Sequence, residues 1–221
     1  ARHLLDASMF WGPSGGVRRV LTVKHLLMRA RGWCHTVMAP GLHGPGLVDC
    51  RGLPLPGSGG YRLPLGRERL ARLIEQQAPD LVESADPYPL AWATLDATTR
   101  LRIPAIAFCH SHLPLLAARW IGGPEGAQTR RGAWAARHAR DYLVDLYNRF
   151  DLVMAPSQGL VRQLHDWGVA HAVLQPLGVD CAAFRPSRAD PAWREQFLRG
   201  LGLPARTRLL VYTGRFALEK H

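Results

Sequence analysis

The sequence is poor in lysine, and several other absences limit the kind of protein it encodes. Lys24 and Lys220 are its only lysines, so the formal net charge of +11 at pH 7 comes almost wholly from arginine. No stretch of about eighteen uncharged apolar residues is present, so no segment is suited to span a bilayer. The first residues lack the apolar core and small-residue cleavage site of a signal peptide. From these absences we expect a cytoplasmic protein.

Cysteine is also scarce and shows no paired spacing. The four cysteines are far apart, and they form neither a CxxC pair nor a spacing typical of a zinc site or a disulfide scaffold. We therefore expect reduced, mostly buried thiols and no metal bound by them.

The arginine surplus favours anionic partners. Nucleic acid, anionic lipid head groups and sugar nucleotides all meet that requirement, and a well-solvated basic surface without a specific partner explains the charge equally well. The sequence contains no fingerprint of an RRM, KH, zinc-finger or helix-turn-helix module, so a nucleic-acid partner is not expected.

The hydrophobic pattern predicts an α/β fold. With 47% hydrophobic residues the chain can bury a sizeable core. Short apolar runs alternate with stretches of helical periodicity, which is typical of a Rossmann-like parallel sheet with helices on both faces. Expected strands cover residues 3–10, 34–41, 81–86, 103–112, 150–157 and 172–180, and expected helices cover 17–31, 67–77, 133–149 and 158–167, with another inside 86–100. Residues 42–65 are expected to be an irregular excursion with short strands, and residues 120–132 a loop. In the helix 17–31 the apolar residues form one broad face, with Lys24 expected off it.

Three parts are expected along the chain. Residues 1–186 are predicted to form one complete Rossmann-like domain. Residues 187–207 are predicted to be a linker with a short helix, because Asp190 can cap it and Pro191 suits its first position. Residues 208–221 are predicted to supply only the first strand and turn of a second Rossmann-like domain, which is therefore expected to be truncated.

Gly15 and Gly16 lie between the first expected strand and the following helix, in the segment GPSGGVRR. Backbone N–H groups and the helix dipole favour an anion at such a position, and the missing side chains permit its close approach. The GxGxxG spacing of dinucleotide-binding proteins is absent. Because glycine turns before helices are common, a purely structural role is the alternative.

A second candidate group, His110, Ser111 and His112, follows the strand in AFCHSHLP. An open parallel sheet collects ligand-binding groups at this end of its strands. No third ligand with matching spacing accompanies the two histidines, so a metal site is not expected. A neutral histidine here is suited to hydrogen bonding a polar substrate, or to capping the strand.

Two further groups carry candidate chemistry. Glu83, Asp86 and Tyr88 lie at another strand end on the same expected edge, where they suit sugar hydroxyls or simple turn formation. Arg215 and Lys220 follow an apolar strand and a glycine-bearing turn in GRFALEK, where a guanidinium and an ammonium can converge on a diphosphate. Taken singly, each of these two charges is more often solvated surface.

The order of these motifs resembles a known family. The segments are SGGVRRVL, AFCHSHLP, DLVMAPSQGLVRQLHDWGV, QPLGVDCAAFRP and LLVYTGRFALEK. Together they resemble the retaining glycosyltransferases of family 4, which have the GT-B fold. The resemblance covers essentially the whole chain, and GVDxxxFxP followed by a strand and GRxxxEK is its most specific part. It implies two Rossmann-like domains across a cleft, the first binding the acceptor and the second most of a nucleotide sugar. No metal and no cofactor are implied, because the nucleoside-diphosphate sugar is a substrate.

The resemblance also implies roles for individual residues. His110 is expected to be catalytic and to approach the transferred sugar. Donor-phosphate contacts are expected from four residues, namely Gly15, Gly16, Arg215 and Lys220. Acceptor contacts are expected from three residues at strand ends, namely Asp86, Tyr88 and Ser111.

The expected function is transfer of a hexose, mannose or glucose, from a nucleoside-diphosphate sugar to a glycan or glycolipid acceptor. The family's downstream acidic motif and nucleotide-base pocket have no counterpart in the sequence, so the chain alone is expected to be inactive. The arginine surplus fits related enzymes that visit anionic membranes, which predicts peripheral attachment at the inner face of the membrane. Two other functions stay open, namely a non-catalytic module that binds an anion or a membrane surface, and a nucleotide-sugar epimerase of the same fold.

Overall fold

The computed structural model describes residues 2–12, 15–56, 58 and 60–213. It divides into two units, Ala1–Leu177 and Gly178–His221. The division falls before residue 186, where the sequence pattern placed the limit of the first domain, and the domain boundaries derived from sequence stay predictions.

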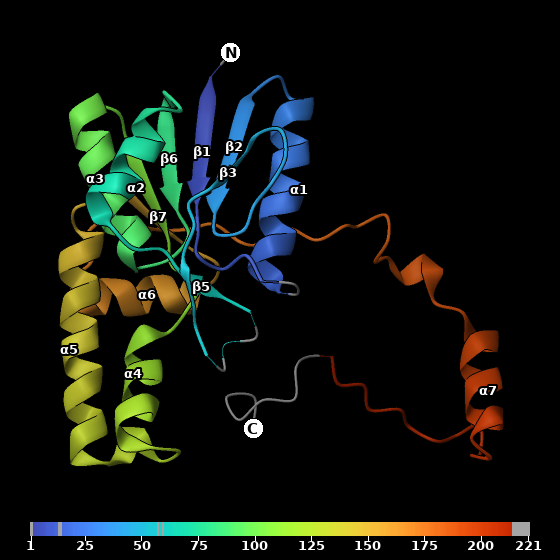
Figure 1. Cartoon of the computed structure of the whole chain (residues 1–221). Helices are drawn as coiled ribbons and strands as arrows, with labels where there is room; N and C mark the ends of the chain where they lie inside the picture. Colours follow the sequence, from blue (N-terminus) through green and yellow to red (C-terminus); the bar gives the residue numbers. More distant parts are fainter. Residues whose placement is uncertain (1, 13–14, 57, 59, 214–221) are drawn as a thin grey trace. The chain divides into compact units, whose positions relative to one another are not determined.

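A seven-stranded sheet forms the centre of the first unit (Figure 1). Its strands are β1 (His3–Ala7), β2 (Cys34–Ala39), β3 (Leu47–Asp49), β6 (Leu81–Ser84), β7 (Ala105–Phe108), β8 (Leu152–Ala155) and β9 (Ala172–Leu174). Their order in the sheet is β3-β2-β1-β6-β7-β8-β9, and every neighbouring pair is parallel. The chain thus builds outward from β1 in one direction and from β6 in the other, which confirms the predicted Rossmann-like sheet.

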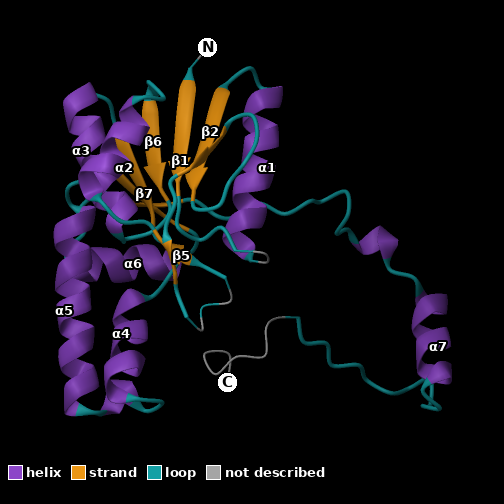
Figure 2. Ribbon diagram, in the orientation of Figure 1, coloured by secondary structure: helices purple, strands orange, loops and turns teal. Residues whose placement is uncertain are grey.

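Helices cover both faces of this sheet (Figure 2). The helix α1 (Gly16–Ala30) lies on one face, and α2 (Arg67–Glu75) and α3 (Pro89–Leu101) lie on the other. The register sets which residues each side receives, because Leu5 pairs with Val82 and Asp6 pairs with Glu83. Successive side chains of a strand point to opposite faces. The apolar pair therefore packs under α2 and α3, whereas the two carboxylates face α1.

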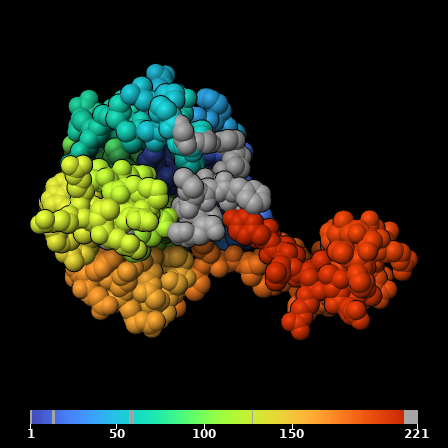
Figure 3. All heavy atoms as spheres, turned by 90° about the horizontal axis from the view of Figure 1, so that it is seen from below, coloured from blue at the N-terminus to red at the C-terminus, as the bar shows by residue number. Residues whose placement is uncertain are grey.

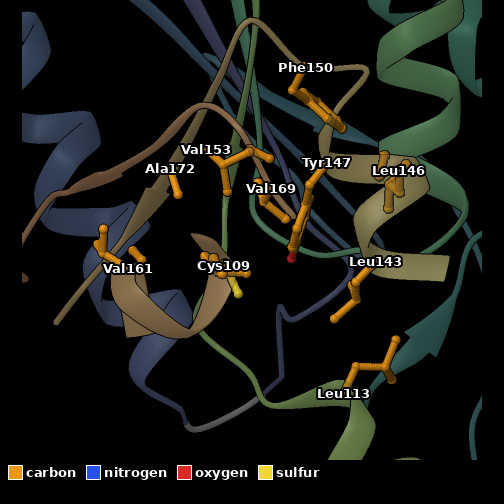
Figure 4. Packing of buried hydrophobic residues seen from close by; sticks show 14 of the residues in the cluster. Cys109, Leu113, Leu143, Leu146, Tyr147, Phe150, Val153, Val161, Val169 and Ala172 are labelled. Atoms are coloured by element: carbon orange, nitrogen blue, oxygen red, sulfur yellow. The ribbon is translucent and has the colours of Figure 1, made fainter. Parts of the chain in front are cut away.

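A second part of the core lies at the other end of the sheet. It joins β7 and β8 to α5 (Arg130–Tyr147) and α6 (Gln158–Trp167). Figure 4 shows the side chain of Tyr147, the last residue of α5, extending toward Cys109, and Phe150, just after the helix, belongs to the same cluster as Val153 of β8. The helix α6 starts where expected, since the Ser157 hydroxyl accepts a hydrogen bond from the Leu160 backbone N–H at 3.2 Å.

The predicted loop 120–132 is wrong at both of its ends. The helix α4 spans Leu113–Gly122, and α5 already begins at Arg130, leaving a short 3₁₀ turn at Gly126–Gln128 between them. A glycine-rich stretch predicts a loop, but two of these glycines serve close packing. A Cβ on Gly126 would overlap the Ala118 carbonyl, and a Cβ on Gly132 would overlap the Gly126 carbonyl. The glycines therefore let α4, the turn and α5 approach one another.

The excursion 42–65 is irregular, as predicted, and carries a small antiparallel pair of β4 (Leu53–Pro54) and β5 (Arg62–Leu63). The four thiols are free, but the expectation that they are mostly buried holds only for Cys50 and Cys109, whereas Cys34 and Cys181 are exposed. Burial raises the pKa of the Cys50 thiol to about 12, so this thiol is unreactive near neutral pH.

The second unit contains the predicted linker helix, α7 (Pro191–Gly200). The Asp190 carboxylate caps it by accepting from the Ala192 backbone N–H at 2.9 Å. The strand expected near Arg208 is not formed in residues 208–213, and Leu210 is 99% exposed. A strand needs a neighbouring strand for its backbone hydrogen bonds, and in the described residues this segment is not paired with one. None of the described helices combines the length and apolar character needed to cross a bilayer.

Candidate active site

Three predicted groups meet at one edge of the sheet. Gly15 and Gly16 follow β1, and Asp86 and Tyr88 follow β6. His110 and Ser111 follow β7. These three strands are neighbours and run in the same direction, so their carboxyl ends share an edge. The sheet reverses its direction of growth between β1 and β6, and open α/β sheets bind ligands in the crevice at such a point. The roles assigned to these residues stay predictions.

Gly15 and Gly16 form the start of α1 and are both exposed. Gly15 has a φ of +154°, and a Cβ there would lie 3.1 Å from the Tyr61 hydroxyl oxygen, so a side chain is disfavoured. Among the described residues, no side chain caps α1 and no acidic residue lies in its first turn. The unsatisfied backbone N–H groups and the positive end of the helix dipole therefore suit an anion.

Arg18 adds positive charge to this first turn. Its guanidinium lies 5.5 Å from the centre of the Trp11 ring and donates a hydrogen bond to the Gly12 carbonyl at 3.3 Å. These contacts keep an arginine beside the glycine turn, where it favours an anion further.

His110 provides an imidazole ring at this edge. Its Nε2 atom is buried and has no hydrogen-bond partner among the described residues. Burial lowers the pKa of His110, and a backbone hydrogen bond with Ala85 acts in the opposite direction. The ring is therefore neutral near pH 7, and its Nε2 can donate or accept a hydrogen bond with a polar ligand, depending on the tautomer.

Aromatic rings surround His110 and link it to the other strand ends. Phe10 lies after β1, and its ring centre is 5.8 Å from that of His110, 5.9 Å from Tyr88 and 5.2 Å from Tyr61, each edge to face. The ring centre of Phe108 lies 6.1 Å from that of His110. Tyr88 and His110 are among the residues predicted from sequence, whereas Phe10 and Tyr61 are not. The available signal for Phe10 was an aromatic residue at the carboxyl end of the first expected strand, on the edge where the other groups were predicted.

Asp86 fastens two of the strand-end loops together. Its carboxylate accepts hydrogen bonds from the Met9 backbone N–H at 2.7 Å and the Tyr88 backbone N–H at 3.3 Å. The residue is only 2% exposed, and burial raises the pKa of its carboxyl to about 6 despite these bonds. Both oxygen atoms thus have backbone partners, which makes Asp86 a support of the edge; its predicted contact with an acceptor stays a prediction.

The two neighbours of His110 differ in role. Ser111 is half-buried, and its carbonyl is 3.9 Å from the Cys109 sulfur. His112 caps α4, since its Nδ1 accepts from the Leu115 backbone N–H at 3.1 Å, and its ring packs edge-on against Trp167 at 5.5 Å. Among the described residues no group of three or more His, Cys, Asp or Glu side chains is placed to hold a metal ion.

A buried ionic network, which the sequence pattern did not predict, lies behind the glycine turn. The Lys24 ammonium of α1 donates to Asp6 of β1 and to Glu83 of β6, both at 2.7 Å. His35 contacts the second Asp6 oxygen at 2.8 Å, and His25 contacts His35 at 2.9 Å. Lys24, expected off the buried face of α1, instead points into the sheet. The network fixes α1, and with it the glycine turn, to the strands that carry the edge.

The carboxyls of this network have opposite pKa shifts. Burial, reinforced by repulsion from Asp6, raises the pKa of Glu83 to about 7. The pKa of Asp6 is lowered, because Lys24 and His35 together outweigh its burial. Below neutral pH one proton therefore sits on Glu83, and the Lys24–Asp6 pair is left as the charged core of the network.

We expect Glu83→Gln to stabilise the protein more at pH 8 than at pH 5.5. A raised folded-state pKa means that the folded protein binds a proton that the unfolded chain has released, so this group lowers stability as pH rises from about 4.5 to above 7. Glutamine resembles the protonated acid at every pH. Urea unfolding should show a gain that is about 1 to 3 kcal/mol larger at pH 8 than at pH 5.5. An equal effect at the two pH values would contradict the assignment of the proton to Glu83.

Arg215 and Lys220 lie outside the described residues. Their predicted contact with the donor diphosphate therefore has no structural counterpart here and stays a prediction.

Comparison with known proteins gives one family. The family model "Glycosyltransferase Family 4" matches residues 13–183. A GDP-mannose-dependent alpha-mannosyltransferase of Mycolicibacterium smegmatis is 30% identical over 170 residues, covering 72% of this chain and 39% of that protein. One of Corynebacterium glutamicum is 27% identical over 161 residues, covering 72% and 35%. The chain thus spans less than two fifths of these relatives.

Solved structures support the fold. A sucrose-phosphate synthase from Thermosynechococcus elongatus superposes with a TM-score of 0.61 at 15% identity, covering 93% of this chain and 54% of that one. A UDP-N-acetylglucosamine 2-epimerase from Rickettsia bellii superposes with a TM-score of 0.50 at 12% identity, covering 92% and 52%. At these identities the likeness concerns the fold alone.

Proposed function

The chain belongs to glycosyltransferase family 4, and we propose that it forms the acceptor-binding part of a retaining enzyme that transfers mannose from GDP-mannose to a glycan or glycolipid. Two relatives with that donor in their names support the choice of mannose and guanosine diphosphate. The enzyme would need no metal, and residues beyond those present here would complete the donor site, so the chain alone would be inactive.

The buried, unpartnered Nε2 of His110 carries this proposal. A buried polar atom without a partner costs roughly 1 to 3 kcal/mol, and this one lies at the switch point of the sheet. A hydroxyl of the transferred sugar would supply the missing hydrogen bond. Because the pKa of His110 is lowered, the ring stays neutral and does not repel the positive charge that develops on the sugar as the diphosphate leaves.

The glycine turn would hold the phosphate side of the donor. Departure of the nucleoside diphosphate builds negative charge, which fixed N–H groups and cations stabilise. The open start of α1 offers such N–H groups at Gly15 and Gly16, and Arg215 and Lys220 would add cations. On the acceptor, Tyr88 and Ser111 would contact hydroxyl groups at the same edge, with Asp86 beside them.

Release of GDP by the full-length protein tests the proposal. We expect GDP to form from GDP-mannose only when an acceptor such as octyl α-mannoside is added, with an α-linked product by NMR and an unchanged rate in EDTA. Conversion of the nucleotide sugar without an acceptor would indicate an epimerase instead. Binding of GDP-mannose without any turnover, across a panel of octyl glycosides, would indicate a binding module.

A further inference from the structure

The helices α4 and α5 form an antiparallel hairpin whose closed end extends past the carboxyl edge of the sheet (Figure 1). We propose that this hairpin tip, residues 119–137, docks on an anionic membrane. The proposal rests on the proposed function in one respect, because a lipid-linked acceptor would give the docking its purpose.

Large apolar side chains are exposed at the hairpin tip. Trp120 and Ile121, in the last turn of α4, are 70% and 56% exposed, and Trp134, near the start of α5, is 51% exposed. Single exposed apolar residues are common, but two tryptophans and an isoleucine at one end of a hairpin are not. Tryptophan favours the membrane–water interface, because its large ring is apolar and its indole N–H is polar.

The charge of the hairpin tip matches an anionic surface. Arg130, Arg131 and Arg137 are exposed, and Arg119 lies in the last turn of α4. Between residues 113 and 140, Glu125 is the only acidic residue. Each basic residue near an anionic bilayer strengthens binding about fivefold. A second copy of the chain would carry the same positive charge, so like-charge repulsion makes it the less suitable occupant.

The hairpin tip is held in a defined shape. The Gly126 and Gly132 backbones leave no room for a side chain. The Thr129 hydroxyl caps α5 by accepting from the Gly132 backbone N–H and donates to the Gly126 carbonyl, both at 3.0 Å. A surface whose backbone is already ordered binds with a smaller loss of conformational entropy.

The position of the hairpin connects it to the candidate active site. Its first helix begins at Leu113, directly after the strand-end segment of His110 and Ser111. Figure 3 looks onto this end of the molecule, and the hairpin, in yellow-green, is in view beside the other strand-end loops. A bilayer at the tip would therefore lie on the side of the sheet where the proposed acceptor is bound.

Flotation of the full-length protein with vesicles tests the inference. We expect binding to vesicles of phosphatidylcholine with about 30% phosphatidylglycerol, and weak binding to pure phosphatidylcholine. The double variant W120S/W134S should lower the partition coefficient at least tenfold. The variant R130Q/R131Q should lower it by a similar factor, with a smaller dependence on salt.

Leu26→Ser is the matched control, because Leu26 is apolar and 65% exposed but belongs to α1, outside the hairpin. This variant should bind as the wild type does. Equal vesicle binding by W120S/W134S and the wild type would overturn the proposal, and so would absence of binding by the wild type. Loss of a dimer in W120S/W134S, seen by sedimentation without vesicles, would assign the tip to a second copy and also overturn it.

Transfer to soluble octyl α-mannoside is measured in parallel. Vesicle binding without transfer refutes only the proposed function, and transfer without vesicle binding refutes only the docking.

Discussion

Replacement of His110 by alanine should lower kcat for mannose transfer by about 100- to 1000-fold, the range found when one hydrogen-bonding group that acts in the transition state is removed. The effect is large because Nε2 is buried, so bulk water does not readily replace the lost hydrogen bond. Steady-state GDP release by the full-length protein measures it. Because His110 has a lowered pKa, its ring stays neutral between pH 7 and 8. Titration of His110 should therefore cause almost no change in the wild-type rate over this range.

His112→Ala provides the matched control for this prediction. His112 lies two residues further along the same segment and serves as a helix cap, so its loss should cost about 1 kcal/mol of stability with turnover kept within about threefold. Turnover of the His110 variant within threefold of the wild type would show that the unpartnered nitrogen faces no reacting group. An equal loss in both variants would point to damage of the strand end as a whole.

Most of the fold could be predicted from sequence because its signals are local. Alternation of short apolar runs with helical periodicity placed the strands of the sheet except β3, which lies inside the predicted excursion 42–65. Ser157 and Asp190 marked helix starts that the structure confirms. The hairpin of α4 and α5 was missed for a physical reason. Glycines that permit close packing, such as Gly126 and Gly132, look in sequence like glycines that end a helix, and only the partner backbone distinguishes the two.

The candidate site was predictable in part. Parallel strands share an edge, so residues after strands could be grouped, and the structure brings Gly15, Tyr88 and His110 to neighbouring strand ends. What their pattern did not reveal is how each side chain is used. Asp86 accepts backbone N–H groups, and Glu83 faces α1. Such partners come from segments distant in the sequence, and no local pattern specifies them.

Lys24 also has partners that the local sequence pattern does not specify. We expect Lys24→Met to destabilise the chain by about 3 to 5 kcal/mol at pH 7.5. The substitution leaves two buried carboxylates, Asp6 and Glu83, facing each other without their shared cation. Attraction that had offset their burial is lost, so the pKa of each should rise. The folded state would then bind protons that the unfolded chain releases above about pH 4.5, and the loss of stability should grow as pH rises. Urea unfolding of the 221-residue chain at pH 5.5 and 7.5 measures both the size and the slope.

Two further variants isolate the cause of that loss. Arg29→Met removes a cation from the exposed side of the same helix and should change stability by no more than about 0.5 kcal/mol. In a Glu83→Gln background the Lys24→Met substitution should cost at least about 1 kcal/mol less than in the wild type, because only one buried carboxylate then loses its partner. Equal costs in the two backgrounds, or a cost below about 1 kcal/mol in the wild type, would show that Lys24 does not hold α1 to the sheet by its charge. If the costs differ as expected, a single lysine in an arginine-rich sequence fixes the helix whose first turn is proposed to bind the donor phosphate. A compact ammonium between two carboxylates fits that position, whereas the planar guanidinium of arginine requires more space.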